Sequence, residues 1–69
     1  MRREAIFLVE EAPEGGFVAR CLGESLFTEG DTIEEVKAAA RDAVMCHFDE
    51  DERPALIRFH IVKEDLIAV

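Results

Sequence analysis

The chain has 69 residues, of which 16 are acidic and 8 basic, so its formal net charge at pH 7 is −8. A chain of this length forms one small domain, here residues 1–69, with a limited hydrophobic core. A negative field of this size disfavours direct binding to the phosphates of DNA or RNA. It suits a basic protein partner, but on charge alone the better expectation is a surface that only keeps a small domain soluble.

The termini and the cysteines bear on location. The first apolar run, residues 5–9, is too short for a signal peptide or a membrane span. Cys21 and Cys46 form neither a CxxC pair nor a disulfide framework. We therefore expect a cytoplasmic protein with reduced thiols and no membrane contact.

The first half of the chain predicts three strands. Residues 5–9 (AIFLV) place apolar side chains on both alternating faces, as in a strand that is covered on both sides. Residues 13–16 (PEGG) have the composition of a turn. Residues 17–22 are expected to return as a second strand, and residues 25–28 to form a short third strand ended by Gly30.

One helix and one further long strand follow. Thr32 with Glu35 three residues later predicts a capping box at the start of a helix that ends near residue 48 or 49. Its apolar stripe has helical spacing and consists of Ile33, Val36, Ala40, Ala43, Val44 and Phe48. Residues 56–62 predict the next strand, and residues 66–69 either a short fifth strand or an extended tail.

The expected fold is therefore α+β, in the order β-β-β-α-β. A right-handed crossover through the helix places the last long strand beside the first, which gives the sheet order 3-2-1-4. One helix covers only one face of such a sheet, and both faces are apolar. We expect the second face to be covered by a homodimer, a larger assembly or another protein. The sequence does not decide which face is open, and Phe7, Val9 and Phe59 are taken as candidate contacts.

Two motifs carry a family resemblance. They are residues 14–19 (EGGFVA) and residues 28–36 (TEGDTIEEV), followed by an alanine-rich helix and the strand at 56–62. Each motif alone is common, but their order and spacing resemble the N-terminal domain of HicB-like antitoxins. Residues 24–26 (ESL) depart from the family's usual Pro-Gly-Cys-type turn.

The resemblance implies a truncated ribonuclease-H-like fold without catalytic activity. In that family, the domain binds a small basic mRNA-cleaving toxin of the HicA type and blocks its active site. Full-length members usually add a C-terminal DNA-binding segment, for which a chain ending at Val69 leaves no room. The expected function is an antitoxin-like binding module, and the alternative is an orphan homo-oligomeric domain that binds a small molecule.

Candidate chemical groups are sparse. A metal-dependent nuclease needs converging carboxylates, and Glu10, Glu11, Glu24 and Asp42 are the available acids. Surface positions are the better expectation for all of them, and we predict no metal, no cofactor and no enzyme. The acidic run Asp49, Glu50, Asp51 and Glu52 lacks the spacing of a calcium loop. It is a candidate docking patch for a basic partner, and an ordinary solvated loop is the better expectation.

The histidines and cysteines have ordinary alternatives. His47 is expected to pack as a half-buried ring near the end of the helix, and His60 alternates with apolar strand residues. A nucleophilic pair between Cys21 and either histidine is the minor expectation, because an isolated cysteine usually packs as a small apolar residue.

Overall fold

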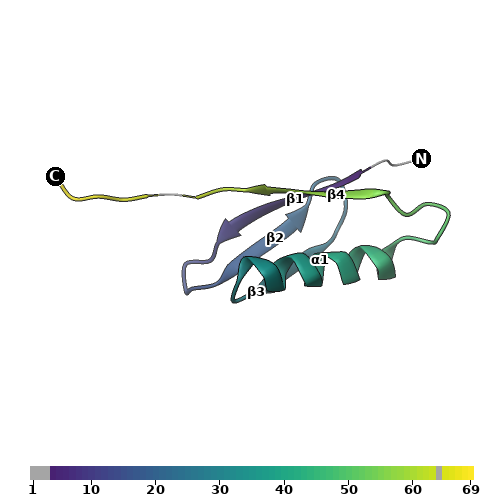
Figure 1. The fold of residues 1–69 in the computed structure, drawn as a ribbon, viewed down its shortest axis with the longest axis horizontal. Helices are drawn as coiled ribbons and strands as arrows, with labels where there is room; N and C mark the ends of the chain where they lie inside the picture. Colours follow the sequence, from purple (N-terminus) through teal and green to yellow (C-terminus); the bar gives the residue numbers. More distant parts are fainter. Residues whose placement is uncertain (1–3, 64) are drawn as a thin grey trace.

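The computed structural model describes residues 4–63 and 65–69. Its elements, in chain order, are β1 (Glu4–Glu11), β2 (Phe17–Cys21), β3 (Phe27–Gly30), α1 (Ile33–His47) and β4 (Leu56–Ile61). The four strands form one sheet in the order β3-β2-β1-β4, and α1 lies along one face of it (Figure 1). The α+β class, the element order and the strand order 3-2-1-4 are all as the sequence predicts.

The pairing is antiparallel on one side of β1 and parallel on the other. β1 pairs antiparallel with β2, where Phe7 lies opposite Cys21, and parallel with β4, where Phe7 lies opposite Phe59. β2 pairs antiparallel with β3. β1 is therefore a central strand, and β3 and β4 are the two outer strands of the sheet.

The core lies between α1 and the sheet face that it covers. Because strand side chains alternate, Ala5, Phe7 and Val9 of β1 all point toward α1. The buried apolar side chains are Ala5, Phe7, Val9, Ala19, Cys21, Val36, Ala40 and Val44. Ala40 at the middle of the helix face is fully buried, and its small side chain lets the helix lie close to the sheet.

The start of α1 is capped as the sequence predicts, with one variation. The Glu35 N–H donates to Thr32 Oγ1 at 3.1 Å, which is the forward bond of a capping box. The return bond comes from the Asp31 N–H, which donates to Glu35 Oε1 at 2.7 Å, so the carboxylate holds the residue before the cap. At the other end the Phe48 N–H bonds to the Val44 carbonyl.

The third strand lies two residues further along the chain than predicted. β3 spans Phe27–Gly30 because the register of the sheet places Phe17 opposite Gly30 and Arg20 opposite Phe27. The Cys21 N–H donates to the Leu26 carbonyl at 3.0 Å, which closes the turn between β2 and β3.

The end of the chain is an extended tail rather than a fifth strand. Residues 65–69 carry no assigned strand or helix, and Figure 1 shows them continuing the direction of β4 beyond the sheet. This tail makes the molecule elongated, with principal extents of 53 × 18 × 18 Å.

Candidate interaction surface

The structure corrects two of the predicted contact residues. Phe7 and Val9 are 0% and 1% exposed because they lie beneath α1. Phe59 is half-buried on the same face, and its ring stacks on Phe7 with a centroid distance of 5.8 Å. α1 would have to leave the sheet before Phe7 or Val9 touched another protein, so both are core residues.

The open face of the sheet carries the other set of side chains. We call this surface the open face, and it consists of the even-numbered residues of β1, β2 and β4 and the odd-numbered residues of β3. Ile6, Leu8 and Val18 are half-buried there without helical cover. Phe27 and Leu56 are 62% and 59% exposed. The second apolar face that the sequence predicts is therefore present, on the side opposite α1.

Charged side chains divide this apolar surface. Leu8 on β1 lies between Arg20 on β2 and His60 on β4. On its other side, Arg20 is paired with Phe27 on β3. At one end Arg58 Nε donates to Glu4 Oε1 at 2.5 Å. This hydrogen bond and the charge of the Glu4 carboxylate raise the pKa of the Arg58 guanidinium. The open face thus has apolar positions set among both cations and anions, as in many non-obligate protein interfaces.

The acidic run between α1 and β4 is fully accessible. Asp49, Glu50, Asp51 and Glu52 are all exposed, and the Glu52 N–H donates to the Asp49 carbonyl at 2.9 Å. Arg53 anchors this loop to the helix, because its NH2 group donates to the Met45 carbonyl at 3.2 Å. The four acidic residues therefore lie on one exposed loop between α1 and β4, which we call the negative patch.

The remaining candidate groups are dispersed. Cys21 is buried on the helix-covered face and His60 is exposed on the open face, so the two point to opposite sides of the sheet. His47 is exposed rather than half-buried, because its Nε2 lies 2.9 Å from Glu24 Oε1 at the edge of the fold. Asp42 is exposed on the helix. Among residues 4–63 and 65–69, no three His, Cys, Asp or Glu side chains gather into a possible metal site.

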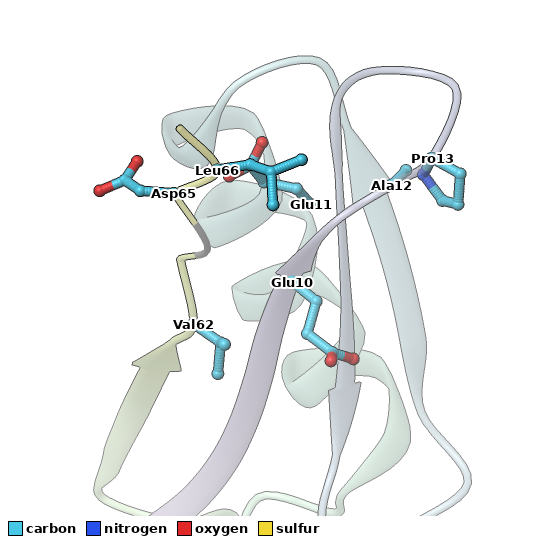
Figure 2. A pocket seen from close by; sticks show the side chains of 7 residues that line it. All are labelled: Glu10, Glu11, Ala12, Pro13, Val62, Asp65 and Leu66. Atoms are coloured by element: carbon cyan, nitrogen blue, oxygen red, sulfur yellow. The ribbon is translucent and has the colours of Figure 1, made fainter. Parts of the chain in front are cut away.

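A groove lies between the end of β1 and the tail. It has a volume of about 660 Å³, and Figure 2 shows seven lining side chains from β1, the following turn and the chain after β4. The lining residues are Glu10, Glu11, Ala12, Pro13, Val62, Asp65 and Leu66. The groove combines apolar walls with three carboxylates.

One sequence signal identifies the open face. Arg20 interrupts the apolar pattern of the second strand, so its face meets solvent. The hairpin register then places Leu8 on that same face and Phe7 on the opposite one. The position of Ile6, Leu8 and Phe27 on the open face therefore follows from Arg20, provided that the strand register is known.

These features define a small α+β module with one helix-covered face and one open face. The chain is 54% identical over 54 residues to a UPF0150 protein of Archaeoglobus fulgidus, covering 78% of this chain and 80% of that protein. It is 40% identical over 68 residues to a UPF0150 protein of Thermotoga maritima, covering 99% of this chain and 96% of that protein. The chain belongs to the UPF0150 family.

Other comparisons add no function. No protein-family model matches the chain, and no solved structure matches it. Within the described residues, the structure has no helix with the length and apolar character needed to cross a membrane.

Proposed function

We propose that this chain is a non-enzymatic, antitoxin-type binding module of the cytoplasm that masks a small basic HicA-type mRNA-cleaving protein. The observation that carries the proposal is the open face, where Phe27 and Leu56 are exposed on a sheet whose core lies entirely on the other side. The resemblance of residues 14–19 and 28–36 to HicB-like antitoxins supports the same function. In this mechanism the module acts by occlusion, and no bond is made or broken.

Charge and apolar area have separate roles in this mechanism. A net charge of −8 and the negative patch of residues 49–52 attract a basic partner and speed encounter. The apolar positions of the open face supply the contact that persists once the two surfaces meet. The expected complex is therefore salt-sensitive in its rate of formation and depends on Phe27 for its lifetime.

The test is inhibition of RNA cleavage by a purified HicA-type ribonuclease encoded in the same cell. Titration with this chain should abolish cleavage at a fixed stoichiometry. Undiminished cleavage at saturating concentrations of this chain would overturn the proposal.

A matched pair of variants separates the acidic patch from total charge. Neutralising Glu50, Asp51 and Glu52 to Gln, Asn and Gln should weaken inhibition by about tenfold at low salt. Neutralising Glu11, Glu14 and Asp42 to Gln, Gln and Asn removes the same charge from exposed positions outside the open face and should change inhibition by less than about threefold. Equal losses in the two variants would mean that only net charge matters.

The alternative is a homo-oligomeric domain that binds a small molecule. The groove of about 660 Å³ between β1 and the tail favours it, because its volume is in the range of small-molecule sites. A cationic apolar ligand suits walls formed by Leu66 and Val62 with the Glu11 side chain directed toward Leu66 (Figure 2). A thermal-shift screen with such amines tests this alternative without any toxin.

A further inference from the structure

The strand β4 and the tail after it form an unusual edge. β4 is an outer strand of the sheet, and the Val62 N–H donates to the Val9 carbonyl at 2.9 Å near the end of the ladder. Beyond that bond the chain continues in the same direction past the end of β1 (Figure 1). Its apolar side chains face water, with Leu66 100% and Ile67 82% exposed. An accessible strand edge that continues into an apolar extended segment is a template for pairing with another strand.

The backbone of β4 has a defined outward set of groups. Since the Val62 N–H bonds to β1, the alternation of a parallel ladder directs the N–H and C=O groups of the even residues inward. The backbone N–H and C=O groups of Ile57, Phe59 and Ile61 therefore point away from the sheet. Pairing of the tail in the same register requires the N–H and C=O groups of residues 65, 67 and 69 to take the same outward direction.

Charge selects the occupant of this edge. Residues 53–63 contain no acid and include Arg58, His60 and Lys63, so this strand is the basic part of an acidic chain. Positions 64 and 65 are Glu and Asp. A basic strand added to the outer edge of β4 would meet like charge there, but a second copy running antiparallel brings its own acidic residues to this edge.

We propose that two copies of this chain associate through antiparallel pairing of β4 and its tail about a two-fold axis at Val62. This register places residues 63 and 65–69 of each copy opposite residues 61 and 55–59 of the other, so the described part of the tail is paired. Ile67 then faces Ile57 of the second copy on the helix side of a continuous sheet. A symmetric pairing of this kind closes on itself, so each edge is used once. The inference does not depend on the antitoxin function, because it concerns the edge of the sheet rather than the open face.

Cysteine cross-linking tests the register. On a Cys46→Ser background, Val62→Cys places two thiols opposite each other in a non-hydrogen-bonded pair, with Cα atoms about 4.5 Å apart. That distance suits a disulfide. His60→Cys lies on the same face of the same strand, but its two copies are about 13 Å apart in this register, too far to bridge. Mild oxidation should give a covalent dimer with Val62→Cys and none with His60→Cys.

A solution measurement tests the contact in the full chain. Sedimentation should show a dimer, or a multiple of dimers, and Ile67→Asp should raise its dissociation constant at least about tenfold, equivalent to 1.4 kcal/mol. Met45→Asp adds the same charge at an exposed apolar residue of α1 and should leave the dissociation constant unchanged. A monomer at all concentrations, equal effects of the two aspartates, or cross-linking through His60→Cys instead of Val62→Cys would each overturn the proposal.

Discussion

At the residue scale, Gly16 lies where the β1–β2 turn meets the junction of β3 and α1. Its φ is +78°, and a Cβ at this position would lie 2.8 Å from the Gly30 carbonyl oxygen. Gly15 has a φ of +104°, but a Cβ there would meet nothing within 4 Å. Both glycines therefore have a positive φ, but only at Gly16 would a Cβ collide with another part of the chain.

Gly16→Ala should therefore cost more stability than Gly15→Ala. The left-handed backbone alone costs about 1–2 kcal/mol in each variant. The clash with a backbone carbonyl should add at least about 1 kcal/mol to Gly16→Ala. Urea unfolding followed by circular dichroism measures both free energies, and equal losses would contradict the close approach to Gly30.

The arginine at position 20 identifies the open face of the sheet more clearly than any apolar residue does. Arg20 lies on the solvent face of β2. Because Leu8 is paired with Arg20, the register of β1 and β2 shows that Leu8 lies on this same face. The periodicity of the sequence alone does not show which face of β1 the helix covers, since Phe7 and Leu8 are both large apolar residues. The candidate contacts Phe7 and Val9 were wrong for this reason, and the exposure of Phe27 was missed because a four-residue strand gives little alternation.

At the element scale, α1 begins where the sequence predicts because its cap is local. Thr32 and Glu35 are three residues apart, and both bonds of the cap form within residues 31–35. The limits of β3 are different, because they depend on which residues of β2 lie opposite. Local signals therefore predict helix ends better than the ends of short strands.

Removing the cap oxygen should loosen the whole helix. Thr32→Ala leaves the Glu35 N–H without its side-chain acceptor and should lower the free energy of unfolding by about 1 kcal/mol. Thr32→Ser keeps an oxygen in the same place and should stay within about 0.5 kcal/mol of the wild type. Chemical denaturation of the three proteins tests this, and similar losses for Ser and Ala would mean that the methyl group, rather than the oxygen, stabilises α1.

At the scale of the whole molecule, the two sheet faces have opposite roles. The covered face concentrates the core in a few side chains, with Phe7 fully buried between β2, β4 and α1. The open face carries Phe27, which is 62% exposed, beside Arg20. The topology was predictable because one crossover helix after a three-stranded meander leaves few possible arrangements of the strands. Which face of the sheet is covered by the helix and which is open could be decided only once the strand register was known.

The same substitution on the two faces should therefore give opposite results. A chain of this size has a stability of about 3–10 kcal/mol, and emptying a buried phenylalanine site costs about 3–5 kcal/mol. Phe7→Ala should consequently lose a third or more of the free energy of unfolding, about 3–5 kcal/mol. Phe27→Ala removes a side chain that already meets water and should change the free energy of unfolding by less than about 0.5 kcal/mol.

Both variants need measurement at one low protein concentration, because self-association would add concentration-dependent stability to any folded form. Circular dichroism during urea titration reports the folded fraction, and the same samples can be tested in the ribonuclease-inhibition experiment. A folded Phe27→Ala protein that has lost inhibition would connect the open face to partner binding. A Phe27→Ala protein as unstable as Phe7→Ala would instead mean that the open face is covered within the stable form of the molecule.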